Sequence, residues 1–246
     1  MKILEVCVDS VESAIAAAQG GADRLELCGN LVIGGTTPTP ALFRAVRAAT
    51  ELPVHVMIRP RCGDFLYAEE ELRIMEEDLR MLRSLGAQGA VFGMLTADGN
   101  LDLAAMERLC SAADGMSVTL HRAFDMCRDP FRSLEDAVSL GIRTILTSGQ
   151  KETCTEGIAL LKELHSASAD RIEIMAGAGL TDKGIPALHA QTGITAFHMS
   201  GKKRVPSAMV YRNPDVYMGL PGLPEYELEI CDADKIRAAA DALRLL

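Results

Sequence analysis

The chain has 246 residues, of which 48% are hydrophobic and 4% aromatic, and its formal net charge is −9 at pH 7. That length suits one large hydrophobic core, and the acidic charge argues against a nucleic-acid or anionic-membrane partner. No apolar run approaches the roughly 18 residues of a membrane helix, and the seven cysteines form no CxxC motif, so we expect a cytoplasmic protein with reduced thiols and no disulfide framework.

The hydrophobic pattern divides the chain into alternating short and long segments. Short β-branched or Leu-rich runs predict strands at residues 3–8, 24–28, 54–59, 90–95, 117–124, 144–148, 172–176 and 196–200. Longer Ala-, Leu-, Glu- and Arg-rich runs predict helices at residues 11–19, 39–49, 69–85, 101–113, 130–140, 153–167 and 182–189. This α/β alternation predicts a single-domain (β/α)8 TIM barrel over residues 1–246, with an open doubly wound sheet as the second choice.

One segment breaks the alternation. Residues 201–228, rich in Pro, Gly, Tyr and Met, stand where a helix would directly follow the eighth strand, and the last helix is predicted only at residues 232–245. We therefore expect a long loop after the eighth strand. Such a loop can be a lid, a substrate wall or a homodimer contact, and a plain surface excursion is the alternative.

In a closed barrel, alternate strand residues point outward beneath the helices or inward toward the centre. The third predicted strand reads VHVMIR over residues 54–59, with apolar and polar or bulky side chains in alternate positions. Other strands repeat this pattern. We therefore expect one interior that holds the following residues: Glu5, Glu26, His55, Arg59, His121, Glu173 and His198.

Buried charged groups are costly unless they pair, so this set needs an explanation. A charge-balanced network inside the barrel is one explanation. Acid–base chemistry is the other, because titratable groups with perturbed pKa values gather at active sites. Under the second interpretation, the candidate catalytic residues are Glu26, Arg59, His121 and Glu173.

Two glycine-containing loops follow the last two predicted strands. Residues 176–179 read AGAG before a helix start, and residues 200–203 read SGKK. TIM barrels often bind phosphate with backbone amides from these two loops, although glycine also serves tight turns. Together with the arginines of the RPR sequence at residues 59–61, the candidate anion-binding residues are Arg59, Arg61, Gly177, Gly179, Ser200 and Lys202.

Cys7 and Cys28 occupy equivalent places on the first two predicted strands. If those places are neighbours in a parallel sheet, the two Cα atoms lie about 5 Å apart. The two thiolates would then suit one soft metal ion such as Cu(I), with Met57 as an added thioether ligand. On the residues alone, cysteines that merely fill core space are the favoured interpretation.

Read together, several segments resemble the copper homeostasis protein CutC family. They are EVCVDSVESA (5–14), GADRLELC (21–28), GGTTPTP (34–40), PVHVMIRPRCGDFLY (53–67), VFGMLTADG (91–99), VTLHRAFDM (118–126), LTSGQ (146–150), IMAGAG (174–179) and FHMSGKK (197–203). The resemblance runs from Glu5 to about Tyr226, and motifs such as RPRxGDF and HRAFD are specific. It implies a TIM barrel, a cytoplasmic location, a homodimer and a part in copper handling.

The resemblance also implies a metal site. It points to Cu(I), with the cysteines of the EVC and ELC motifs as ligands, and these are Cys7 and Cys28 here. Cys62 departs from the family pattern, in which the RPRGGDF motif usually has glycine at this position. The additional thiol would be either a further metal ligand or an incidental small residue.

Two function classes remain open after this reading. The first is a copper homeostasis protein that binds Cu(I) through Cys7 and Cys28. The second is an enzyme that acts on a small anionic metabolite, in which the arginines and Lys202 hold the charge while His121 or a glutamate moves a proton. A scaffold role is a weaker third class. The sequence names neither a substrate nor the oligomeric state.

Overall fold

The structure, a computed structural model, describes residues 2–219 and 222–246. A closed barrel of eight parallel strands in chain order forms its centre. The strands are β1 (Ile3–Val8), β2 (Arg24–Leu27), β3 (Val54–Met57), β4 (Gly89–Phe92), β5 (Ser117–Leu120), β6 (Thr144–Thr147), β7 (Glu173–Ala176) and β8 (Ala196–Met199). The predicted (β/α)8 TIM barrel is confirmed, and closure between β8 and β1 excludes the open sheet.

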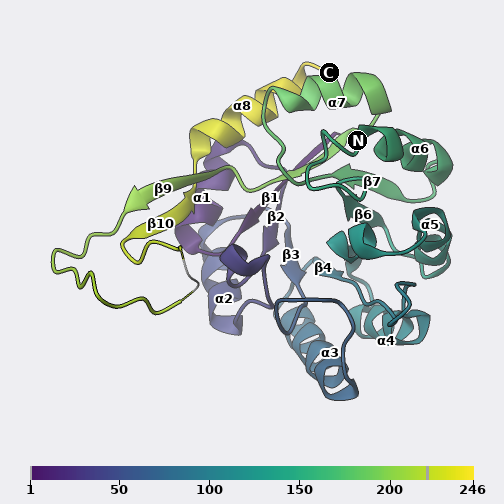
Figure 1. The fold of residues 1–246 in the computed structure, drawn as a ribbon, viewed down its shortest axis with the longest axis horizontal. Coiled ribbons are helices and arrows are strands. Elements are labelled where there is room, and N and C mark those ends of the chain that lie inside the picture. Colours follow the sequence, from purple (N-terminus) through teal and green to yellow (C-terminus); the bar gives the residue numbers. More distant parts are fainter. Residues whose placement is uncertain (1, 220–221) are drawn as a thin grey trace.

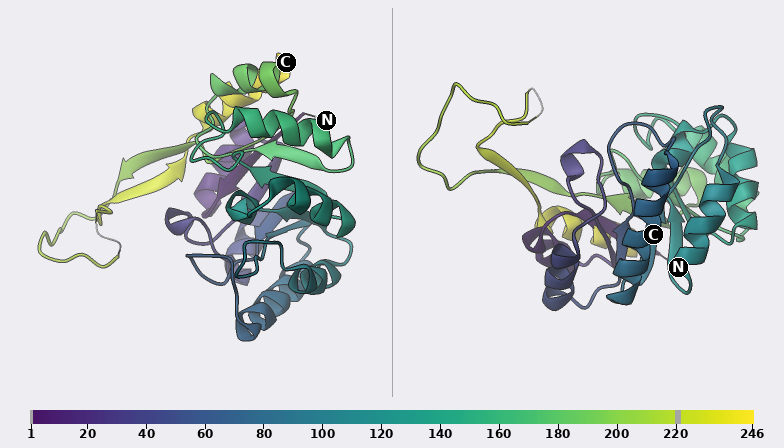
Figure 2. Two further views of the ribbon diagram at one scale, coloured as in Figure 1. Left: turned by 45° about the vertical axis from the view of Figure 1, so that its right-hand side comes forward. Right: turned by 90° about the horizontal axis from the view of Figure 1, so that it is seen from below.

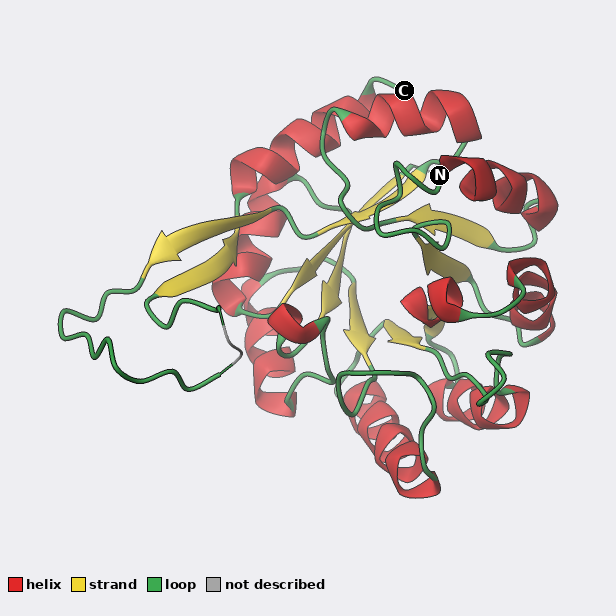
Figure 3. Ribbon diagram, in the orientation of Figure 1, coloured by secondary structure: helices red, strands yellow, loops and turns green. Residues whose placement is uncertain are grey.

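Helices surround this barrel on all sides (Figures 1 and 3). They are α1 (Val11–Gly20), α2 (Pro40–Ala49), α3 (Glu69–Ser84), α4 (Leu103–Ala113), α5 (Pro130–Ser139), α6 (Ile158–Ser168), α7 (Gly184–Thr192) and α8 (Ala233–Arg244). None of the helices in the described part of the chain has both the length and the apolar character that a membrane span requires.

The alternation along the strands places the two kinds of side chain as expected. Leu4 and Val6 of β1 and Leu25 of β2 are fully buried beneath the helices. Glu5 and Glu26 alternate with them and are also buried, but on the inner face of the barrel. The barrel therefore has an apolar outer layer and a partly polar interior.

Several strands are shorter than predicted at their carboxyl ends. The largest difference follows β5, where residues expected to continue the strand form a 3-10 helix, η2 (Arg122–Met126). The His121 side chain begins this helix, because its Nδ1 accepts a hydrogen bond from Ala123 N at 3.2 Å. A second short 3-10 helix, η1 (Leu31–Ile33), follows β2. These turns shape the carboxyl end of the barrel.

The segment expected to be one long loop differs from that expectation. Its ends form two antiparallel strands, β9 (Lys202–Pro206) and β10 (Glu227–Cys231). We call these strands, together with the described residues 207–219 and 222–226 between them, the arm. Oppositely charged side chains face each other across these strands, with Lys202 Nζ 2.9 Å from Glu229 Oε2, and such pairs favour strand pairing. Figure 2 shows that the arm projects away from the barrel.

Candidate functional site

A cavity of about 340 Å³ opens at the carboxyl ends of the strands. That volume is typical of a small-molecule site. Its wall includes several residues that the sequence singled out: Cys7, Glu26, Arg59, His121, Gly179, His198, Ser200 and Lys202. Its apolar and remaining lining comes mainly from Leu31, Gly34, Met57, Phe65, Arg122, Leu146, Ala178, Leu180 and Met199.

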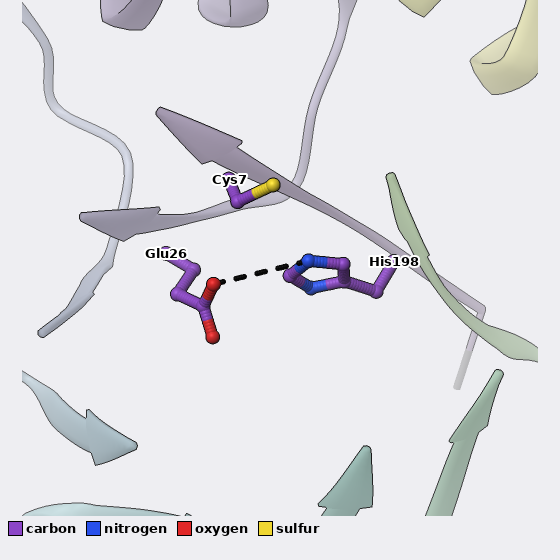
Figure 4. Close-up of side chains that lie close together, drawn as sticks. All are labelled: Cys7, Glu26 and His198. Atoms are coloured by element: carbon purple, nitrogen blue, oxygen red, sulfur yellow. Dashed lines mark ion pairs between the residues drawn. The ribbon is translucent and has the colours of Figure 1, made fainter. Parts of the chain in front are cut away.

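A cluster of potential metal ligands forms one side of the cavity (Figure 4). It contains Cys7, Glu26 and His198, and one ligand atom from each lies within 4.8 Å of the other two. The strand register explains this proximity, because Cys7 of β1 pairs with Glu26 of β2 and β8 carries His198 on the other side of β1. The His198 Nε2 atom lies 3.8 Å from Glu26 Oε2.

His198 is held in place from below by two further charged residues. Its Nδ1 lies 2.8 Å from Glu5 Oε1, and Arg24 Nε donates to Glu5 Oε2 at 2.6 Å. Burial acts to raise the pKa of Glu5, but the His198 hydrogen bond and the Arg24 charge outweigh it and lower this pKa to about 2. Glu5 is therefore a buried carboxylate that neutralises the two cations beside it.

The imidazole of His198 and the carboxyl of Glu26 have pKa values shifted upward. Burial opposes protonation of His198, yet the nearby Cys7 sulfur and the carboxylates raise its pKa well above the ordinary value. Burial is the main cause that raises the pKa of Glu26. The surroundings of His198 thus favour its protonated form, and its Nε2 faces Glu26.

Cys28 is more completely buried than Cys7. The predicted pairing of Cys7 with Cys28 is wrong, because the register of β1 against β2 sets Cys7 opposite Glu26. The Cys28 thiol donates to Glu26 Oε2 at 3.4 Å and is fully buried. Burial, reinforced by the Glu26 charge, raises the pKa of this thiol well above its usual range. Its assignment as a metal ligand stays a prediction.

Arg59, Phe65 and His121 form the wall across the cavity from Cys7. The Arg59 guanidinium lies 5.2 Å from the centre of the Phe65 ring, and the Phe65 and His121 rings are 4.9 Å apart. Burial first, and then the Arg59 charge, lower the pKa of His121 to about 3. His121 is therefore neutral at physiological pH. Because its Nδ1 accepts from Ala123 N, its proton resides on Nε2.

Other residues that the sequence singled out lie outside the cavity wall. Arg61 turns toward the start of α3, where its Nε donates to Glu71 Oε1 at 2.6 Å. Glu173 is the first residue of β7, at the opposite end of the barrel, and accepts from Thr144 Oγ1 at 3.4 Å. Gly177 sits beneath the site, where a Cβ atom would lie 2.7 Å from Leu146 and 3.2 Å from His198. The catalytic and anion-binding roles of these residues stay predictions.

Sequence reasoning missed Arg122 as a wall residue. Its Nε donates to Asp125 Oδ2 at 2.7 Å, and its Nη2 donates to Ser148 Oγ at 2.9 Å. Both Arg122 and Asp125 belong to the HRAFD motif, so the motif signal was present. The position of Arg122 could not be assigned from sequence, because the start of the 3-10 turn that brings it to the cavity was predicted as a strand.

Comparisons with known proteins agree on one family. A model of the CutC family matches residues 2–203. A family protein CutC of Bacteroides thetaiotaomicron is 46% identical over 242 residues, which cover 98% of this chain and 97% of that protein. The human copper homeostasis protein cutC homolog is 44% identical over 236 residues, which cover 96% of this chain and 86% of the human protein.

A solved structure shows the same similarity. The crystal structure of a copper homeostasis protein CutC from Streptococcus agalactiae superposes with a TM-score of 0.78 at 34% sequence identity. The match covers 81% of this chain and 99% of that one. The resemblance noted in the sequence motifs is thus confirmed over most of the chain.

Proposed function

This chain belongs to the CutC family, and on that premise we propose that it binds one Cu(I) ion at the mouth of the barrel through Cys7 and His198. The main support for this proposal is the cluster of Cys7, Glu26 and His198, whose potential ligand atoms lie within 4.8 Å of one another. The human relative is named a copper homeostasis protein. Under this proposal, copper is the ion that the protein binds and transfers, and not a permanently bound cofactor.

The donor set fits Cu(I). Thiolate and imidazole are soft and borderline ligands, which Cu(I) prefers over carboxylates alone. With metal–sulfur and metal–nitrogen bonds of about 2.3 and 2.0 Å, the two donors across a two-coordinate ion lie about 4.3 Å apart. The ligand atoms of the cluster lie within 4.8 Å of one another, which is compatible with that separation. His198 Nε2 must release its proton to coordinate, and the Glu26 carboxylate beside it is a suitable acceptor.

Cys28 is the second thiol to test. Its Sγ contacts the Glu26 carboxylate, but it lies outside the cluster of mutually close ligand atoms. In its observed position, the thiol belongs to an apolar group with Met57 and Val91. We therefore rank it below His198 as a ligand, while the family resemblance ranks it beside Cys7.

An anaerobic titration against a chromogenic Cu(I) chelator tests the proposal. Wild-type protein is expected to take one Cu(I) per chain, and Cys7→Ser and His198→Gln are each expected to lose this stoichiometric binding. Cys62→Ser is the matched control, because Cys62 is an exposed thiol outside the cavity wall. Cys28→Ser decides whether the second thiol contributes. Unchanged affinity in both Cys7→Ser and His198→Gln would contradict the proposed site.

We also infer a cytoplasmic location and a homodimer. All seven cysteines are free thiols, which suits a reducing compartment. The arm exposes large apolar side chains, with Val210 98% and Met218 82% accessible, and such exposure is typical of an interaction surface. Sedimentation of the wild type and of a Val210→Asp, Met218→Asp variant tests the dimer. We expect a dimer for the first and a monomer for the second, and a monomeric wild type would refute it.

A further inference from the structure

Arg59 is a buried cation without a carboxylate partner. Its residue is 7% exposed. Among residues 2–219 and 222–246, no Asp or Glu oxygen lies within the 4.0 Å ion-pair distance of its guanidinium. The two neighbouring arginines differ, since Arg61 pairs with Glu71 and Arg122 with Asp125. A buried charge is costly unless it is neutralised, so Arg59 calls for an anion that the chain does not supply.

The backbone holds Arg59 in a fixed orientation. Nη1 donates to Gly35 O at 3.0 Å, and Nη2 donates to Gly63 O at 3.0 Å. Carbonyl oxygens fix the guanidinium without cancelling its charge. The Nε–H of Arg59 has no partner, and Nη2 has a second hydrogen beyond the one given to Gly63. The Nε and Nη2 donors lie on one edge of a guanidinium, an arrangement that matches two oxygens of a carboxylate or phosphate.

Two more donors in the same region lack partners. His121 Nε2 is buried and without a hydrogen-bond partner, and because Nδ1 already accepts from Ala123 N, Nε2 must donate. The Tyr67 hydroxyl is buried beside the Arg59 guanidinium, which can donate to its oxygen but cannot accept its proton. Unsatisfied buried polar atoms are uncommon in native proteins, and several donors together indicate a missing acceptor.

We propose that the Arg59 side of the cavity binds the oxyanion group of a small organic molecule, a carboxylate or a phosphate, with Arg59 and His121 Nε2 as donors. The oxyanion-binding end contains neither Cys7 nor His198, although it shares one cavity with them and with Glu26, and this inference goes beyond the copper proposal. His121 extends from β5, which lies across the eight-stranded barrel from β1 with Cys7. The half-exposed Arg122 at the rim adds positive charge for an incoming anion.

The rest of the cavity indicates what the molecule carries besides its anionic group. Glu26 Oε1 also lines the cavity without a hydrogen-bond partner. A hydroxyl or amine of the ligand would satisfy this acceptor. Between the two ends the wall is largely apolar, with Met57, Leu146 and Met199. The cavity of about 340 Å³ therefore suits a polyhydroxy acid or a sugar-phosphate fragment better than an inorganic ion.

Calorimetric titration and thermal-shift measurements with four probes test the inference in metal-free protein. The probes are glycerate, glycerol 3-phosphate, propionate and glycerol. The first two carry both an oxyanion and hydroxyl groups, propionate lacks the hydroxyls, and glycerol lacks the anion. We expect glycerate, glycerol 3-phosphate or both to bind more tightly than propionate and glycerol. Equal binding of glycerol would show that no anion is recognised, and the absence of any binding below about 10 mM would overturn the inference.

Three variants identify the site. Arg59→Lys keeps the charge but removes the two-donor edge, and we expect affinity for the bound oxyanion to fall about tenfold or more. His121→Asn retains an acceptor for Ala123 N but lacks the Nε2 donor, so we expect weaker oxyanion binding. This variant leaves Arg59 in place, so it remains a valid test if Arg59→Lys disturbs the surrounding loops. Arg61→Lys is the matched control, from the same RPR sequence but outside the cavity wall. Unchanged affinity in both test variants would overturn the inference.

A fourth variant distinguishes this site from the copper site. Cys7→Ser is expected to bind the oxyanion with wild-type affinity while it loses Cu(I). The same variant therefore reports on both proposals with opposite outcomes. If Cys7→Ser abolished oxyanion binding as well, a separate Arg59 site would be refuted, whatever the result of the copper titration.

Discussion

Glu5 offers a direct measure of how the barrel interior supports the site. Its carboxylate is fully buried between Arg24 and His198, and its pKa is lowered from 4.5 to about 2. At about 1.36 kcal/mol per pH unit, this difference corresponds to roughly 3 kcal/mol of stability at neutral pH. The substitution Glu5→Gln leaves two buried cations without a carboxylate, so we expect it to cost about 3–5 kcal/mol in the free energy of unfolding.

The pH dependence has a defined sign. Because the folded pKa of Glu5 is below the unfolded value, the stabilisation is fully present above pH 4.5 and is lost as the pH falls toward about 2. Urea unfolding of the wild type and Glu5→Gln between pH 7 and pH 3 measures the difference. We expect the gap between the two proteins to shrink by about 2 kcal/mol between pH 7 and pH 3.

Glu173 provides the control for this experiment. It faces the same interior, but no cation lies within ion-pair distance in the described part of the chain, and burial raises the pKa of this carboxyl. We expect Glu173→Gln to be close to neutral at pH 7. The reasoning would be refuted if Glu5→Gln cost less than about 1 kcal/mol at pH 7, or if the gap stayed constant as the pH fell.

Three further perturbations address other parts of the structure. Gly89→Ala would place a Cβ 2.4 Å from the His55 ring, so we expect the free energy of unfolding to fall by about 1–3 kcal/mol. A Gly89→Ala, His55→Ala double variant should recover most of this loss. Additive losses of the two substitutions in urea unfolding would contradict the clash. His121 has a pKa of about 3, below that of an unfolded histidine, so its contribution to stability falls as pH drops below about 6.5, by about 1.4 kcal/mol per unit. In His121→Asn, the free energy of unfolding should depend less steeply on pH below about 6.5 than in the wild type. The same pH dependence in both proteins would refute the conclusion that His121 is buried in its neutral form. The exposed Lys202–Glu229 pair should contribute less than about 1 kcal/mol to the free energy of unfolding. Glu229→Gln should therefore unfold near the wild-type midpoint and still bind one Cu(I) per chain. A large loss of stability would show that the arm is coupled to barrel stability.

The fold was accessible from the sequence because its signals are local. The alternation of apolar and polar residues, as in Leu4, Glu5 and Val6, predicts which side chains face the helices and which face the interior. This prediction does not depend on how the strands pair. Helix starts are equally local, as where the Asp129 side chain accepts from the backbone of Arg132 at the beginning of α5. The arm was predicted as loop because its strands depend on cross-strand pairs, such as Lys202 with Glu229, between residues distant in sequence.

The site was accessible only in part. The sequence identified Glu26, Arg59, His121 and His198 as residues of one interior, and the cavity wall contains them all. It also treated Arg59 and Arg61 alike, since both belong to the RPR sequence. In the folded chain, Arg61 pairs with Glu71 of α3, whereas Arg59 has no carboxylate within ion-pair distance among the described residues.

The sequence by itself determined the barrel, its family and the set of polar residues that face the interior, because each follows from short-range pattern or motif. Only the tertiary structure decided which of these residues touch. The register of β1 against β2 sets Cys7 beside Glu26 instead of Cys28, and closure of β8 onto β1 brings His198 to the same point. Register and closure arise from the packing of the whole barrel, and a shift of a single residue reverses the face to which every side chain points.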